Sequence, residues 1–189
     1  PFWLDAEHSG QRATVLRVPV TYPPDPVPHM ISGMGVPDLL GTQGTYTLLA
    51  TRPMPGAESG GRVLLAPVDE DGIVRSQLDG PAHPFDTEAP PLSLPMQLAA
   101  SSDGAILTLD DQAYPLKLGQ WSNWIRVRYS MGIFGSVPGM LRAYLREGFP
   151  RPLLYISPLQ ADPSESALPI SSPPQYAANL AARIGDFHT

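Results

Sequence analysis

The stretch richest in groups that can hold a ligand runs from Ser32 to Thr45, with four glycines and three hydroxyl side chains. Successive backbone N–H groups in such a loop can be presented to an anion. A dinucleotide fingerprint would need glycine where Asp38 stands, and a P-loop would need Gly-Lys-Ser/Thr, so neither template fits. Two alternatives stay open: a structural turn in which Asp38 and Thr42 cap local backbone, or a loop beside a substrate. The candidate loop residues are Ser32, Gly33, Gly35, Asp38, Gly41, Thr42, Gly44 and Thr45.

A second candidate is the pair Trp121 and Trp124, three residues apart in a region with β-strand patterning. Two such rings can form a sugar-stacking face, and packing in a core or an interface is the alternative. Nucleophile motifs of the form Gly-x-Ser-x-Gly or Ser-x-x-Lys are absent, and the segment 135–139 is only a near miss. The chain therefore offers binding groups rather than a nucleophilic centre.

Metal-ligating patterns are weak. The four histidines, at positions 8, 29, 83 and 188, show no spacing of a helical zinc site. The run 69–72 is superficially similar to a calcium loop but lacks the later liganding positions, so we expect a hairpin turn. The absence of cysteine excludes disulfides and thiolate sites and leaves the cellular compartment open. We expect no cofactor and no metal in this segment.

Composition limits the fold and the partners. The 189 residues, of which 24 are proline and 42% are hydrophobic, suffice for one sizeable core and make a helical bundle improbable. A net charge of −6, without a basic cluster, argues against nucleic acid as a partner. No apolar run approaches the roughly 20 residues that a membrane span needs. The chain begins without Met and ends abruptly, which predicts a fragment of a longer protein.

Local patterns predict α/β elements at both ends and antiparallel strands in the middle. A helix is expected over 2–9 and another over 174–184, with a doubly buried strand over 13–20 and an extended loop over 21–37. Hairpins are expected over 62–78 and 92–109, an antiparallel strand over 121–131, a helix or strand over 140–147, a strand over 152–158 and a loop over 160–174. The predicted fold class is α+β, with α/β edge elements flanking an antiparallel β-rich insertion. The three segments are 1–59, 60–150 and 151–189.

The runs 16–24 and 32–46 resemble the middle of bacterial alkaline-phosphatase-superfamily proteins of the type I phosphodiesterase/nucleotide pyrophosphatase-like branch. The segments 121–124, 154–163 and 169–173 are similar to later landmarks of that family. The most specific piece is 32–46, and the resemblance spans nearly the whole chain.

This resemblance implies a metal-dependent hydrolase of phosphate esters, with two divalent metals, usually zinc, and a Thr or Ser nucleophile. The family's nucleophile and metal ligands should lie outside residues 1–189, so no catalytic residue is carried onto this chain. We expect a central, non-catalytic segment that shapes substrate access, with the rest of the parent hydrolase as its partner and self-association possible through open strand edges. The alternative is a self-standing β-rich module that binds glycan or protein through Trp121 and Trp124.

Overall fold

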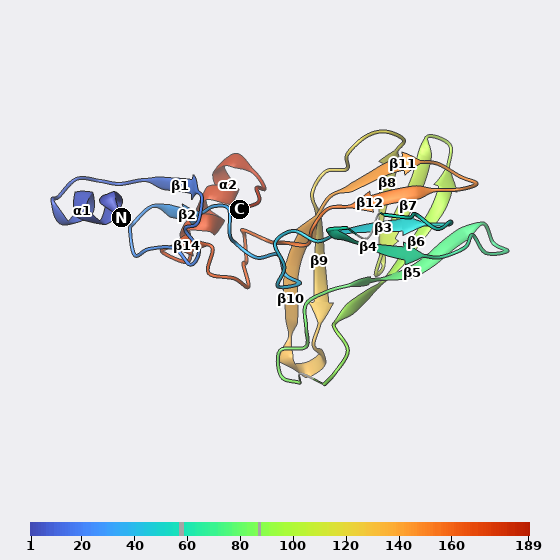
Figure 1. The fold of residues 1–189 in the computed structure, drawn as a ribbon, viewed down its shortest axis with the longest axis horizontal. Coiled ribbons are helices and arrows are strands. Elements are labelled where there is room, and N and C mark those ends of the chain that lie inside the picture. The colour runs from blue at the N-terminus through green and yellow to red at the C-terminus, as the bar shows by residue number, and fades with distance from the viewer. Residues whose placement is uncertain (57–58, 87) are drawn as a thin grey trace. The chain divides into compact units, whose positions relative to one another are not determined.

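The computed structural model describes residues 1–56, 59–86 and 88–189, which form two compact units (Figure 1). Unit 1 contains Pro1–Asp38 and Gln160–Thr189, and unit 2 contains Leu39–Leu159. Unit 2 is therefore one continuous segment, and unit 1 is built from the two ends of the chain. The three segments expected from the sequence, 1–59, 60–150 and 151–189, stay a prediction.

Unit 1 is a small assembly of short elements. These are α1 (Phe2–His8), β1 (Val15–Val18), β2 (Met30–Ser32), β13 (Gln160–Ala161), β14 (Ser171–Ser172) and α2 (Tyr176–Ile184). The strand β2 lies between β1, to which it is parallel, and β14, to which it is antiparallel. Buried Val15, Val27 and Met30 form a hydrophobic cluster against which Trp3 and Leu4 of the α1 helix pack. The helix α1 is too short to be stable by itself, and burial of these apolar groups holds it against unit 1.

Both helices were predicted from the sequence and are confirmed within a few residues. In α2, Ala177 and Ala181 are buried while Ile184 is exposed, so one side of the helix packs on the unit. The helices and strands of unit 1 are short because proline-rich segments flank them.

Unit 2 contains two four-stranded sheets and a separate hairpin. Its strands are β3 (Tyr46–Ala50), β4 (Gly61–Leu65), β5 (Ile73–Asp79), β6 (Ser93–Ser101), β7 (Gly104–Leu109), β8 (Gln112–Lys117), β9 (Ile125–Ser130), β10 (Ser136–Leu141), β11 (Ala143–Glu147) and β12 (Leu153–Ile156). One sheet has the order β11-β12-β3-β4, in which only β3 and β4 are parallel. The other is the antiparallel meander β5-β6-β7-β8. A short 3₁₀ turn, η1 (Gly132–Phe134), connects β9 to β10.

The meander shows the alternation expected of a sheet with one buried face. In β6, Leu94, Met96 and Leu98 are buried, whereas the residues between them are exposed. Their partners Leu107 and Leu109 in β7 are buried as well. The predicted hairpin over 92–109 is confirmed, with a turn at Ser102 and Asp103.

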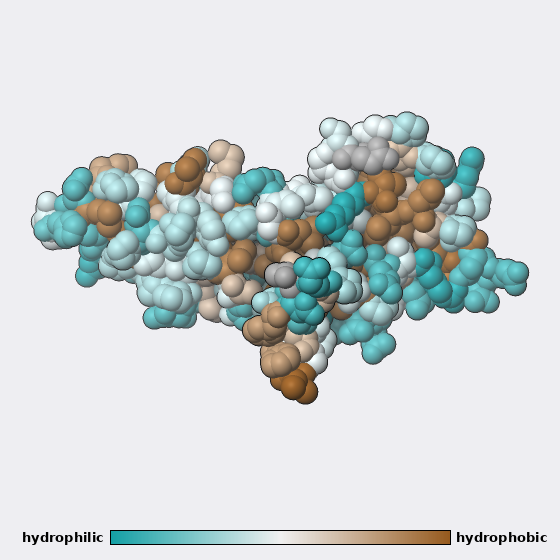
Figure 2. All heavy atoms as spheres, turned by 60° about the horizontal axis from the view of Figure 1, so that its bottom comes forward, coloured by the Kyte–Doolittle hydropathy of each residue, from teal (hydrophilic) through white to brown (hydrophobic). Residues whose placement is uncertain are grey.

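The hairpin between β9 and β10 carries an exposed hydrophobic end. The buried Ile125, Val127 and Tyr129 alternate with exposed residues, which confirms the predicted one-sided antiparallel strand. At the η1 turn, Ile133 is 95% exposed and Phe134 lies 5.1 Å from Phe85, measured between ring centroids. Figure 2 shows hydrophobic residues gathered at a protruding end of unit 2.

The predicted fold class, α+β with α/β edge elements, is wrong. The chain has 39% of its residues in strands and 10% in helices, with two α-helices in the part that the structure describes and mostly antiparallel sheets. The expected doubly buried strand over 13–20 is only β1, four residues long, with Leu16 51% exposed. Proline lacks an N–H donor, so the proline-rich ends form short strands rather than a long parallel sheet.

Other local expectations also need correction. The segment 62–78 is no hairpin, because β4 pairs with β3 in one sheet and β5 pairs with β6 in the other. Only the bridge between Val68 and Val74 remains at the turn, and Pro67 interrupts the ladder of β4. The loops expected over 21–37 and 160–174 contain the short strands β2, β13 and β14. The ambiguous segment 140–147 is strand throughout, divided between β10 and β11.

Within the described ranges, no helix combines the length and the apolar character needed to cross a membrane.

Candidate functional site: an open aromatic face on unit 2

One face of the sheet β11-β12-β3-β4 carries a row of aromatic and aliphatic side chains. Tyr144 of β11 is directly opposite Tyr155 of β12, which in turn is opposite Leu48 of β3. Trp121 extends the row through an antiparallel bridge to Tyr144. Residues in direct register share one side of a sheet, so these four side chains lie on the same face. We call Tyr46, Leu48, Trp121, Tyr144 and Tyr155 the aromatic face.

Alternation along each strand determines which side is open. Ala143 and Leu145 in β11 and Leu154 and Ile156 in β12 are at most 1% exposed. Tyr144 and Tyr155 stand between them and are only partly buried. The apolar positions of each strand thus supply the core, and the intervening aromatic rings are left on the other side.

The rings contact one another in a definite arrangement. Tyr46 stacks on Tyr155 with a centroid distance of 5.2 Å and an interplanar angle of 26°. Trp121 stands at 90° to Tyr155, with 5.6 Å between centroids. Tyr155 therefore forms a floor and Trp121 a wall, an edge-to-face geometry that aromatic pairs favour.

A cavity of about 450 Å³ lies on this face, lined by Leu48, Trp121, Tyr144, Arg146 and Tyr155. Its volume is within the roughly 300–1,000 Å³ of small-molecule sites. Trp121 is 49% exposed, so much of its ring is available for contact. The cavity combines apolar walls with one cationic side chain.

Backbone and side-chain contacts hold Trp121 in place. Ser122 N donates to Ala143 O at 2.8 Å, and Ala143 N donates to Ser122 Oγ at 2.9 Å. Arg142 Nε donates to Ser122 O at 2.8 Å, and its guanidinium carbon lies 5.5 Å from the Trp121 ring and 5.7 Å from the Trp124 ring. Both distances are within the range of cation–π attraction. The two tryptophans singled out from the sequence therefore meet around Arg142, and only Trp121 lines the cavity.

The charged residues in and next to the cavity, Arg146, Glu147 and Arg52, differ in the hydrogen bonds and ion pairs that they form. Arg52 Nη2 donates to both carboxylate oxygens of Glu147, at 2.9 and 3.0 Å. This hydrogen bond holds the pKa of Glu147 below its usual value. Among the described residues, no hydrogen bond or ion pair joins the guanidinium of Arg146 to another side chain. The carboxylate of Glu147, the residue after Arg146, is thus bound by Arg52. The guanidinium N–H groups of Arg146 can therefore donate to a ligand.

The phenol of Tyr155 is a neutral donor at physiological pH. Burial, and after it the neighbouring Tyr46, raises the pKa of Tyr155. Its O–H group therefore keeps its proton and can donate to a ligand.

The glycine-rich stretch is divided between the units, with Ser32, Gly33, Gly35 and Asp38 in unit 1 and Gly41, Thr42, Gly44 and Thr45 in unit 2. Ser32 Oγ donates to Thr21 O at 2.7 Å, and Gly33 N donates to Thr21 Oγ1 at 3.0 Å. Thr42 and Thr45 share a hydrogen bond of 2.7 Å between their hydroxyl groups. Asp38 is 3% exposed. Ser32 thus bonds to a residue of its own unit, as do Thr42 and Thr45, and a role beside a substrate stays a prediction.

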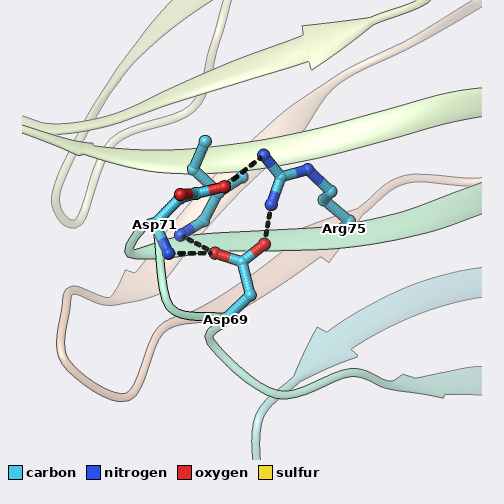
Figure 3. Close-up of polar contacts among 4 residues, drawn as sticks. Asp69, Asp71 and Arg75 are labelled. Carbon is cyan, nitrogen blue, oxygen red and sulfur yellow. Dashed lines mark hydrogen bonds and ion pairs between the residues drawn. The ribbon is translucent and has the colours of Figure 1, made fainter.

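The carboxylates of the segment 69–72 are engaged within their own turn (Figure 3). Asp69 Oδ1 accepts hydrogen bonds from the backbone N–H groups of Asp71 and Ile73, both at 3.0 Å. Arg75 forms ion pairs with Asp69 and Asp71. Across the described ranges, no group of three His, Cys, Asp or Glu side chains could hold a metal ion.

Comparison with known proteins gives no relative: no family model matches the chain, and neither a curated protein nor a solved structure matches it. Tyr46, Tyr144, Arg146 and Tyr155 were not identified as site residues from the sequence, although the alternation of aliphatic residues with polar-ended ones over 143–146 is a signal for an outward-facing Tyr144.

Proposed function

We propose that this chain is the non-catalytic, β-rich recognition segment of a longer phosphate-ester hydrolase. Unit 2 presents the aromatic face to a ligand. The remainder of the parent hydrolase supplies the nucleophile and the ligands of two divalent metals, for which zinc is the first candidate. The resemblance of 16–24 and 32–46 supports the hydrolase part of the proposal. The cavity beside Trp121 carries the recognition part.

An exposed tryptophan is informative because large apolar rings are normally buried. Trp121 is 49% exposed, although hydrogen bonds on both sides of Ser122 fix the backbone next to it. The sheet thus displays the ring on a rigid support. A fixed backbone beneath a contact group lowers the entropy cost of ordering that group when a ligand binds.

A self-standing binding module is the second candidate, and one observation favours it. Unit 2 holds the whole cavity and has its own buried face in each four-stranded sheet. Such a unit can bind glycan or protein without a hydrolase. The two candidates differ in what surrounds residues 1–189 in the gene.

The first experiment is to read the coding sequence on both sides of this chain and to express the protein that it encodes. The proposal expects a Thr or Ser nucleophile upstream, Asp and His ligands downstream, and phosphodiesterase activity that a chelator abolishes. Trp121→Ala should then raise KM while kcat changes little, because the residue contacts substrate away from the reacting atoms. Ile106→Ala, on the exposed face of the other sheet, is the control and should leave both constants unchanged.

Absence of any nucleophile and metal ligands in the flanking sequence would overturn the hydrolase part and favour the binding module. Retention of KM in Trp121→Ala, with an active hydrolase, would overturn the recognition role instead.

Self-association through strand edges is a further part of the proposal. β4 is the last strand of its sheet, and its Leu65 is 59% exposed. Such an edge can pair with another chain. Light scattering should then show a dimer that Leu65→Lys converts to monomer, and a wild-type monomer at high concentration would contradict this.

A further inference from the structure

The cavity on the aromatic face is lined by a cation, the guanidinium of Arg146, whose charge, after the hydrogen bond from Arg52, also helps to lower the pKa of its neighbour Glu147. Arg146 lines the cavity from β11, and it has no hydrogen bond or ion pair to another described side chain. Its sequence neighbour Glu147 is held by both oxygens in the contact with Arg52. The guanidinium therefore remains available for an anion, which it can bind with two parallel hydrogen bonds.

A second guanidinium lies on the same face but is already fixed. The guanidinium of Arg142 lies over the rings of both Trp121 and Trp124, and its Nε donates to Ser122 O. Its charge adds to the positive potential at Trp121, although the chain as a whole carries −6. A basic patch on an acidic protein favours an anionic ligand over a neutral one.

The remaining walls select for a ring. Tyr155 and Leu48 form the floor, and Trp121 stands perpendicular to Tyr155 at one side. A flat ring placed on the floor meets the edge or the face of Trp121. Aromatic contacts of this kind, next to a guanidinium, are typical of sites that bind a planar body with one polar group.

We propose that the cavity binds a small ring-bearing organic anion, with the ring on Tyr155 and Trp121 and the anionic group on Arg146. This inference rests on the recognition role proposed above and names the class of ligand. A ring without charge leaves Arg146 unpaired, and an anion without a ring leaves the aromatic walls exposed. Both halves of the ligand are therefore required for full affinity.

The test is a titration of residues 1–189, followed by the indole N–H signals of the three tryptophans in ¹⁵N–¹H NMR spectra. The probes are phenyl phosphate, phenol and inorganic phosphate, at equal ionic strength. Phenyl phosphate should shift the Trp121 signal and leave that of Trp3 unchanged, because Trp3 lies in unit 1 and donates to Asp25. Phenol and inorganic phosphate should each bind at least tenfold more weakly than phenyl phosphate.

Variants separate the two halves of the site. Arg146→Gln should weaken phenyl phosphate binding about tenfold without changing phenol binding, since it removes the charge and leaves a shorter, neutral polar side chain. Arg12→Gln, an exposed arginine of unit 1, is the matched control and should have no effect. Trp121→Phe keeps an aromatic wall and should retain most of the affinity, whereas Trp121→Ala should not.

A titration with glucose 6-phosphate in place of phenyl phosphate shows whether the preferred ring is a sugar or an aromatic group. Binding of either probe, together with a loss of that binding in Arg146→Gln, supports the proposal. Equal affinity for phosphate and phenyl phosphate, an unaltered affinity in Arg146→Gln, or no shift of Trp121 overturns it. The titration needs no hydrolase activity. Failure here is therefore distinguishable from a missing nucleophile in the flanking sequence.

Discussion

Gly61 and Gly80 each face a tyrosine ring, and the same substitution should affect them very differently. A Cβ added at Gly61 would lie 2.2 Å from the Tyr46 ring, and one added at Gly80 would lie 2.2 Å from the Tyr129 ring. Both contacts are too short to be tolerated, so in each variant something must move. The Tyr46 ring is partly exposed in β3, whereas Tyr129 is 0% exposed.

The expected magnitudes follow from what can move. In Gly80→Ala the buried ring has nowhere to go, and overpacking costs about 1–3 kcal/mol. The loss of backbone freedom in the unfolded chain offsets about 0.4–1 kcal/mol of this. We therefore expect a net destabilisation of about 1–2 kcal/mol. In Gly61→Ala the Tyr46 ring can turn toward solvent, and the lost stacking on Tyr155, about 0.5–1.5 kcal/mol, is nearly offset by the same entropy term.

Urea unfolding followed by near-ultraviolet circular dichroism measures the difference. With a slope of roughly 2 kcal/mol per molar urea, Gly80→Ala should lower the midpoint by about 0.5–1 M, and Gly61→Ala by much less. Gly148→Ala is the control, because the nearest atom to its added Cβ is a side-chain carbon of Leu118 at 3.9 Å. Equal midpoints for Gly80→Ala and Gly148→Ala would refute the reasoning that the closeness and burial of Tyr129 decide the cost.

Three further predictions concern the rest of the molecule. Gly33→Ala should destabilise unit 1 by about 2–3 kcal/mol and speed its proteolysis, because the added Cβ would lie 2.4 Å from backbone atoms of Arg17 and Val18; wild-type protease resistance would contradict this. Burial raises the pKa of Tyr129 above its usual 10.0, so its contribution to stability is complete below pH 10 and is lost at higher pH as the unfolded chain ionises. Tyr129→Phe should therefore move base-induced unfolding, followed by circular dichroism, to higher pH, and an unchanged midpoint would argue against a buried phenol. The hydrogen bond from Arg52 lowers the pKa of Glu147, so its contribution is present above the usual pKa of 4.5 and fades as the pH falls toward the depressed value. Arg52→Gln should return the carboxyl titration seen by NMR toward 4.5, and an unshifted titration would show that the ion pair does not form in solution.

Sequence patterns predicted the elements whose signal is local. The helix over 174–184, the hairpin over 92–109 and the one-sided strand that became β9 depend on periodicity and on turn residues next to them in the chain. The supposed hairpin over 62–78 failed for the opposite reason. The turn at 69–72 formed as its residues specify, but pairing of β4 with β3 is a contact between segments far from that turn.

The candidate site shows the same division. Trp121 and Trp124 were visible as a pair, yet their relation through Arg142 depends on a backbone bridge between Trp121 and Tyr144. Tyr46 and Tyr155 are 109 positions apart and stack because β3 and β12 are neighbours in the sheet. No local pattern contains that register.

The sequence by itself determined the composition limits, the turns and the alternation of buried and exposed positions, since these follow from backbone preferences and from the hydrophobicity of adjacent residues. Tertiary structure alone decided which strands pair, which of two faces stays open, and that Arg146 lines a cavity with Trp121 and Tyr155 and forms no ion pair among the described residues. The physical reason is that strand pairing and ring stacking act between side chains that are distant in the chain, and their energies depend on the packing of the whole sheet.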